Sequence, residues 1–196
     1  MKKSLLAVIL AVALVAPVFA AKGDKSINAK VGLGVSNNLN MKVDDTTMGY
    51  EMKMPISIGA EFFYGLMDNL SVGIGINYGF DSDLKANISY IGSSRLTSYY
   101  VAVKPEAKLD SKIFSSMYLI GQIGGSNVNI KSSNGSYSAE GDMGIYLGFG
   151  AGTIIKDAFI VEFIVSSANS KISVDGVNGD LNYTATTLNV VYKFAI

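Results

Sequence analysis

The sequence predicts an all-β fold: an eight-stranded antiparallel up-and-down transmembrane β-barrel preceded by a cleaved signal peptide. Three observations predict it. The chain opens with a leader that is basic and then apolar. The rest consists of segments in which apolar and polar residues alternate with a period of two, and the connections between these segments are alternately short and long. A period of two is typical of strands, whereas the apolar residues of amphipathic helices repeat about every 3.6 residues.

The leader indicates export. Two lysines at its start are followed by the apolar run Leu5–Val15, and Val18-Phe19-Ala20 fits a signal-peptidase site. The run is shorter than the roughly 20 apolar residues of a membrane-spanning helix. We therefore expect residues 1–20 to be removed and residues 21–196 to form one outer-membrane β-barrel domain.

Composition excludes several function classes. Without the two leader lysines, the chain has 14 basic and 16 acidic residues, so its net charge is close to zero. It therefore lacks the basic footprint of a nucleic-acid-binding protein. The chain has no Cys and no His, so it has neither disulfides nor a base poised near neutral pH, and we expect no enzyme activity. No cofactor or metal is expected either. The run Asp175–Asp180 has oxygen ligands that suit calcium, but Asp, Asn and Gly are also ordinary loop residues.

Eight segments show the alternation. In chain order they are 27–35, 50–64, 70–80, 99–108, 116–125, 144–151, 159–166 and 188–196. The second is the clearest, because its even positions carry residues such as Met52 and Phe62 whereas its odd positions include Glu51 and Glu61. The fifth is ambiguous, because Ile120 fits its register poorly.

The connections between these segments alternate in length. Turns at residues 67–69, 110–112 and 156–157 are short, and the others are long and rich in Asn, Ser, Gly and Asp. The long ones cover 36–49, 81–97, 126–142 and 167–183. We expect them to be solvated loops. Short turns on one side and long loops on the other are typical of bacterial outer-membrane barrels, whose long loops are extracellular.

The glycine content of the polar face indicates which face points inward. Residues such as Gly32, Gly75 and Gly148 fit the narrow interior of an eight-stranded barrel, which the large apolar residues of the other face would overfill. The apolar face is therefore expected to meet outer-membrane lipid. A soluble, lipocalin-like binding barrel is the alternative.

Inward charges are the candidate functional residues. Counted from the short-turn side, five of them lie at similar heights: Lys30, Glu61, Glu106, Glu162 and Lys193. Barrel closure would place Glu162, Lys193, Lys30 and Glu61 on neighbouring strands, in the order minus, plus, plus, minus. Because an unpaired buried charge is costly, we predict a salt-bridged plug. The alternative is that strand stagger separates these charges and water screens each one.

The leader, the eight segments and the connection pattern resemble the small outer-membrane barrels of the OmpA and OmpX type. The last strand, with Tyr192, Phe194 and Ile196, resembles the C-terminal signal read by the barrel assembly machinery, although the family usually ends in Phe where this chain has Ile196. The resemblance implies an outer-membrane location and a structural or surface-interaction role, with an extracellular ligand at the loops as a further partner. A narrow pore or a carrier of small or hydrophobic compounds is the alternative function.

Overall fold

The computed structural model describes residues 22–43, 46–86, 89–133, 138–174 and 177–196. The predicted signal peptide and the start of the run 175–180 lie outside these residues. The strands are β1 (Lys25–Val43), β2 (Thr46–Met52), β3 (Ile56–Met67), β4 (Leu70–Gly79), β5 (Ser82–Ala86), β6 (Ser89–Lys108), β7 (Phe114–Ser132), β8 (Ser138–Glu140), β9 (Gly144–Ile155), β10 (Phe159–Val174) and β11 (Val177–Ala195). In this part of the chain, no helix is long and apolar enough to cross a bilayer.

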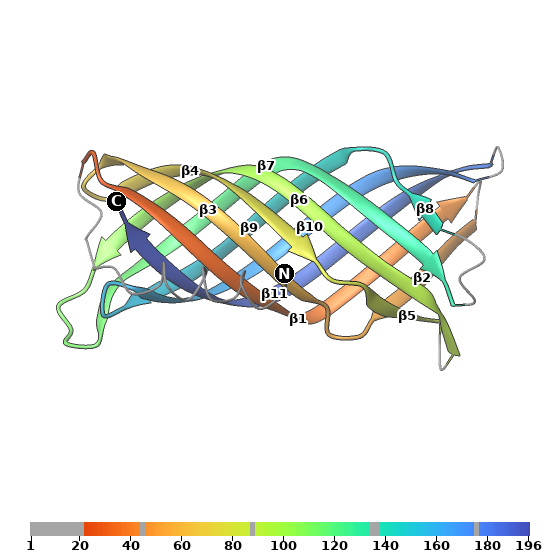
Figure 1. Ribbon diagram of the computed structural model, residues 1–196, viewed down its shortest axis with the longest axis horizontal. Helices are drawn as coiled ribbons and strands as arrows, with labels where there is room; N and C mark the ends of the chain where they lie inside the picture. Colours follow the sequence, from red (N-terminus) through yellow and green to blue (C-terminus); the bar gives the residue numbers. More distant parts are fainter. Residues whose placement is uncertain (1–21, 44–45, 87–88, 134–137, 175–176) are drawn as a thin grey trace, which may run out of the picture.

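The strands close into a barrel. The pairings run β1, β3, β4, β6, β7, β9, β10, β11 and back to β1, and every pair is antiparallel. The ring formed by the described residues is consistent with the expected eight-stranded barrel. β2, β5 and β8 prolong the lines of β3, β4 and β9 toward one end, and the C-terminus lies at the other, the short-turn end (Figure 1).

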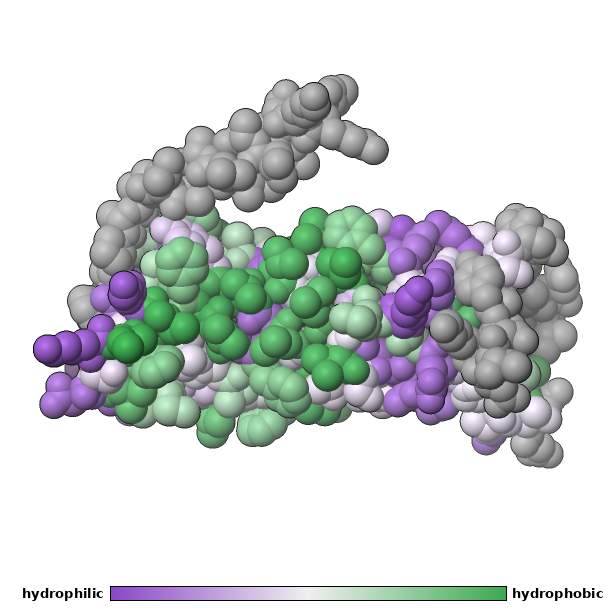
Figure 2. Space-filling view, turned by 90° about the horizontal axis from the view of Figure 1, so that it is seen from below, coloured by the Kyte–Doolittle hydropathy of each residue, from purple (hydrophilic) through white to green (hydrophobic). Residues whose placement is uncertain are grey.

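The outer face next to the short-turn end is apolar, as predicted. Ile74, Phe149 and Val190 are each more than half exposed there, and green surface covers this part of the barrel wall in Figure 2. Exposing such a surface to water would be unfavourable, whereas the acyl chains of lipid solvate it. The structure also settles the fifth segment, because Ile120 points inward and is 1% exposed.

Strand pairing continues through most of the segments expected to be loops. β1 reaches Val43 and β7 reaches Ser132, and the pair β10 and β11 is registered up to Val174 opposite Val177. At 19 residues, β1 is longer than the roughly 9–11 residues a strand needs to cross a bilayer. The expectation of irregular loops is therefore wrong for these residues, and the barrel wall extends beyond its apolar band.

In several strands this extension reverses which residues face inward. A bulge between Gly34 and Ser36 shifts β1, so that Leu33 faces outward and Leu39 inward. Between β2 and β3, Met54 has a φ of 32° and is followed by Pro55, which has no N–H to donate. Met52, expected on the outward face, consequently points inward and is buried.

Candidate functional site in the barrel lumen

A buried ion-pair cluster occupies the half of the lumen nearer the short turns. The Lys30 ammonium on β1 lies 2.9 Å from a carboxylate oxygen of Glu61 on β3 and 3.8 Å from one of Glu162 on β10. All three side chains are buried. One lysine therefore holds two carboxylates that come from strands far apart in the sequence.

Neutral side chains complete the hydrogen bonding of this cluster. The Tyr100 hydroxyl accepts a hydrogen bond from Lys30 and donates one to Glu61, both at 2.7 Å. The Tyr118 hydroxyl donates to Glu162 at 2.9 Å. The Asn28 amide donates to the other carboxylate oxygen of Glu61 at 3.2 Å. The Asn189 amide donates, also at 3.2 Å, to the Glu162 oxygen that Tyr118 does not contact. We call Lys30, Glu61, Glu162, Tyr100 and Tyr118 the charged network; each carboxylate oxygen in it has a partner.

The inward glycines make room for the network tyrosines. A Cβ at Gly75 on β4 would lie 2.6 Å from the Tyr100 ring, and one at Gly152 on β9 would lie 2.5 Å from the Tyr118 ring. Both distances are too short for real contacts. The glycines on the polar face therefore serve packing inside a narrow barrel, as their strand period indicated.

Lys104 borders the network and forms no ion pair with the residues that the structure describes. Its ammonium lies 4.4 Å from the ring centre of Phe63 and 4.9 Å from that of Tyr118. Such cation–π contacts offset part of the cost of burying the charge. The sequence placed Lys104 on the inward face of its strand but gave no reason to join it to the other charges, because the two rings come from β3 and β7.

Two of the five predicted plug residues lie elsewhere. The expected contact between Glu162 and Lys193 is wrong: in the register of β10 with β11, Asn189 opposes Glu162, whereas Lys193 lies nearer the short-turn end. Glu106 is also near that end, and one of its carboxylate oxygens is buried without a hydrogen bond. The stagger between strands separates these residues, and an inward position alone does not reveal that stagger.

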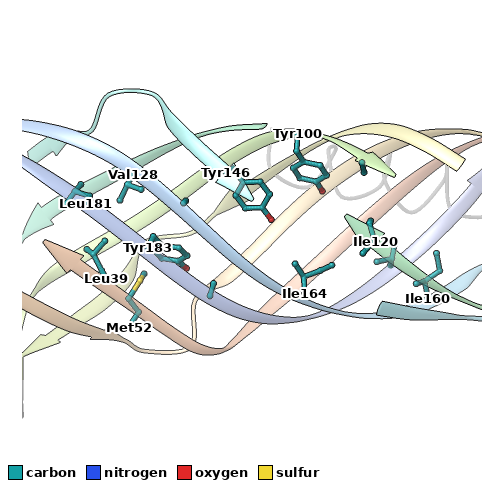
Figure 3. Close-up of a cluster of buried hydrophobic side chains, with 14 of the residues drawn as sticks. Leu39, Met52, Tyr100, Ile120, Val128, Tyr146, Ile160, Ile164, Leu181 and Tyr183 are labelled. Carbon is teal, nitrogen blue, oxygen red and sulfur yellow. The ribbon is translucent and has the colours of Figure 1, made fainter. Parts of the chain in front are cut away.

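Apolar side chains point into the other half of the lumen, among buried serines and Asn37. Leu39, Val128 and Leu181 are 0% exposed, and Met52 and Leu84 pack in the same cluster (Figure 3). We call these five residues the apolar plug. A cavity of about 50 Å³ is lined by Met52, Asn189 and several serines. That volume holds only a few water molecules.

The residues of the expected assembly signal lie at the short-turn end of β11. By register, Tyr192 and Phe194 share the outer face with their β1 partners Ala29 and Ile27. The Tyr192 ring packs edge-on against Phe194 at 4.7 Å and against Phe159 at 5.1 Å. Ile196 is exposed. The arrangement is an aromatic cluster at the border of the apolar band.

A closed antiparallel barrel with an apolar outer band and a polar, buried lumen defines a transmembrane β-barrel protein. The family model described as outer membrane protein beta-barrel domain matches residues 6–194, and the chain belongs to that family. This makes the soluble, lipocalin-like alternative wrong. It also gives the chain the outer-membrane location that the sequence indicated.

Solved structures with the same fold are distant in sequence. The outer membrane protein AlkL has a TM-score of 0.54 at 8% identity, covering 93% of this chain and 95% of its own. Neisserial surface protein A has 0.51 at 10% identity, with 87% and 97% covered. OprG from Pseudomonas aeruginosa has 0.50 at 12% identity, with 90% and 98% covered. Among curated proteins, no sequence matches the chain.

Proposed function

We propose that the protein is a non-conducting outer-membrane barrel that acts as a surface-interaction protein through the wall extending beyond the bilayer. The filled lumen carries this proposal. The charged network lies across the bore at one level and the apolar plug at another, and the cavity lined by Met52 and Asn189 measures only about 50 Å³. A solute crossing the barrel would have to displace both.

The interaction surface is the polar outer wall of the extension. Asn40, Asn182 and Asn169 lie side by side across β1, β11 and β10. The next row in the same direction consists of Lys42, Asp180 and Lys171. These side chains point away from the lumen. Amide and charged groups in adjacent rows suit a hydroxyl-rich partner such as a polysaccharide, because each row offers both donors and acceptors.

A hollow runs along this surface. A cavity of about 890 Å³ is lined by residues that include Asn169, Asn182 and Lys171, and a second of about 380 Å³ lies beside Lys42 and Asp180. Because paired strands hold these side chains, binding would order few residues and cost little conformational entropy. A wall of paired strands therefore replaces the solvated loops expected from the sequence as the interaction surface.

Conductance in planar lipid bilayers tests the filled lumen. The folded full barrel should insert and show no steady openings, whereas a general porin inserted in the same bilayer should conduct. Steady openings of this barrel would favour the narrow pore. Faster entry of an apolar dye into vesicles that carry the barrel would favour a carrier instead, for which the apolar plug would be the route.

Adhesion of vesicles to immobilised polysaccharides tests the surface role. Vesicles carrying the barrel should bind neutral or sulfated polysaccharide beads more than empty vesicles do. The double variant Asn169→Ala with Asn182→Ala should lose most of that binding. Replacing outward Ile74 by Leu, within the apolar band, is the matched control. No binding to either kind of bead would contradict the polysaccharide proposal.

A further inference from the structure

A second cavity opens at the short-turn end, away from the polar outer wall. It measures about 490 Å³ and lies between the turn that joins β6 to β7 and the turn that joins β9 to β10. Two hydrogen bonds tie these turns together. The Lys156 N–H donates to the Ile113 carbonyl, and the Asp157 N–H donates to the Ser115 hydroxyl, both at 3.1 Å. The walls of the cavity are therefore fixed against each other.

The lining of this cavity is basic. It includes four lysines, Lys108, Lys112, Lys156 and Lys193, but two acidic residues, Glu106 and Asp157. The whole chain is balanced in formal charge. The excess of positive charge is thus a property of this end of the lumen, and it favours anions.

Polar groups without partners converge on the same cavity. The Ser116 hydroxyl and one carboxylate oxygen of Glu106 are buried without a hydrogen bond. Lys193 is 5% exposed, and its charge interacts with those of Glu106 and Asp157 without forming an ion pair with any described residue. Buried polar groups are nearly always paired, so unsatisfied ones around a single cavity point to a bound molecule that satisfies them.

The β9–β10 turn keeps a charged side chain where the backbone favours other residues. Lys156 and Asp157 have φ values of 47° and 66°, a left-handed region that suits Gly, Asn and Asp far better than Lys. Lys156 therefore makes the turn less stable than Gly or Asn would. A lysine at a position with such a cost fits a role for its side chain in the cavity.

We propose that this cavity binds a small carboxylate that also carries a hydrogen-bond donor, such as an amino acid or the free end of a short acidic peptide. Lys193 pairs with the carboxylate, and the three other lysines supply the surrounding positive charge. Ser116 donates to a ligand oxygen, and Glu106 accepts from the ligand's ammonium or hydroxyl group. In barrels of this type the short turns face the periplasm, so the ligand is either a free periplasmic acid or a cell-wall peptide.

NMR titration of the full barrel in lipid nanodiscs tests the site. The probes are glutamate, succinate and a soluble peptidoglycan fragment with free carboxylates, each compared with sodium chloride at equal ionic strength. Saturable shifts should appear at the amides of residues 108–116 and 156–157. Glutamate should bind more tightly than succinate, because its ammonium group satisfies Glu106. Tighter binding of the fragment identifies the cell wall as the source, and tighter binding of glutamate identifies a free acid.

Two variants and a control make the assignment specific. Lys193→Met should weaken binding about tenfold or more, because it removes a charge-assisted hydrogen bond. Lys156→Asn should weaken binding while making the barrel more resistant to urea, since Asn tolerates the left-handed turn. Lys53→Met, an exposed lysine between β2 and β3 and away from this cavity, should change neither property. Shifts no larger than those caused by sodium chloride, or unchanged binding by both Lys193→Met and Lys156→Asn, would overturn the proposal.

Discussion

The two halves of this barrel are built from the same strands but have opposite distributions of apolar and polar side chains. Next to the short turns, apolar side chains such as Ile74 face outward and the charged network fills the lumen. Beyond the apolar band, the apolar plug lies inside and rows of Asn, Lys and Asp face outward. The first half resembles a membrane protein and the second a water-soluble one. Both halves bury their inward side chains, but the interior carries charges where the outer face is apolar and is more apolar where the outer face is polar.

The largest effect is expected from charges placed on the outer face of β11. Tyr192→Lys with Phe194→Lys should block membrane insertion, because both residues lie at the lipid border and in the segment we expect the assembly machinery to read. Asn182→Lys with Thr184→Lys changes outward residues of the same strand in the water-facing half and should insert normally. Heat-modifiable gel migration of membrane fractions measures insertion. Equal yields of the two variants would contradict the division into halves.

Within the membrane half, loss of Lys30 should be the most destabilising single change in the lumen. Lys30→Met leaves Glu61 and Glu162 buried without their ion-pair partner, which costs about 3–5 kcal/mol where burial is complete. Urea unfolding in lipid vesicles measures the free energy of unfolding. Lys42→Met, at an exposed position of the same strand, is the control and should have little effect. If the two variants unfold alike, the network does not stabilise the barrel.

In the water-facing half, stability should depend on the apolar plug. Leu181→Ala removes a side chain that is 0% exposed and should cost about 2–5 kcal/mol through lost burial and the cavity left behind. Leu188→Ala on the same strand faces lipid and should cost less. The same urea measurement compares them. A larger loss for Leu188→Ala would show that the plug is loosely packed.

A smaller effect should follow from crowding a network tyrosine. Gly152→Ala places a methyl group against the Tyr118 ring and so displaces the donor to Glu162, at an expected cost of about 1–3 kcal/mol. A Cβ at Gly121 would meet no atom within 4 Å, which makes Gly121→Ala a matched control. Only the first variant should unfold at lower urea. Equal midpoints would mean that Tyr118 can move at no cost.

The smallest expected effect is the coupling free energy between substitutions in the two halves. Lys30→Met and Leu181→Ala should add within roughly 0.5 kcal/mol, because the residues share no partner. Lys30→Met combined with Glu61→Met should instead cost less than the sum of the single changes, since the pair is in contact. Double-mutant cycles in urea measure both. Strong coupling between Lys30 and Leu181 would show that the lumen is one packed unit.

Sequence reasoning predicted the membrane half well. Period-two alternation alone indicates the face of each residue, so the inward positions of Lys30, Glu61 and Glu162 and the outward apolar band followed directly. The prediction that Lys193 contacts Glu162 was wrong, because the height of one residue relative to the other depends on the stagger between strands. Tyr100 and Tyr118 were on the inward face, but their hydroxyl partners come from other strands and left no local signal.

The water-facing half was misread for a different reason. There the apolar residues that mark a strand are sparse, because one side is polar and bulges or breaks shift the phase. On β11, inward Leu181 lies out of phase with outward Leu188 and Val190. On β1, the bulge leaves Leu39 in phase with Leu33, although the two side chains face opposite sides of the wall. A segment rich in Asn and Ser then looks like a loop. Testing whether the alternation resumes after a one-residue shift would have revealed the continued strands.

The continuous pairing of the extension limits how the exposed surface can change. In an irregular loop most positions tolerate substitution, but here every second residue, such as Leu181 and Tyr183 on β11, is fixed by packing in the lumen. Variation is left to the alternate positions, such as Asp180 and Asn182. Backbone in paired strands is also a poor substrate for proteases. Sequences that diverge on this surface should therefore differ at intervals of two along β10 and β11.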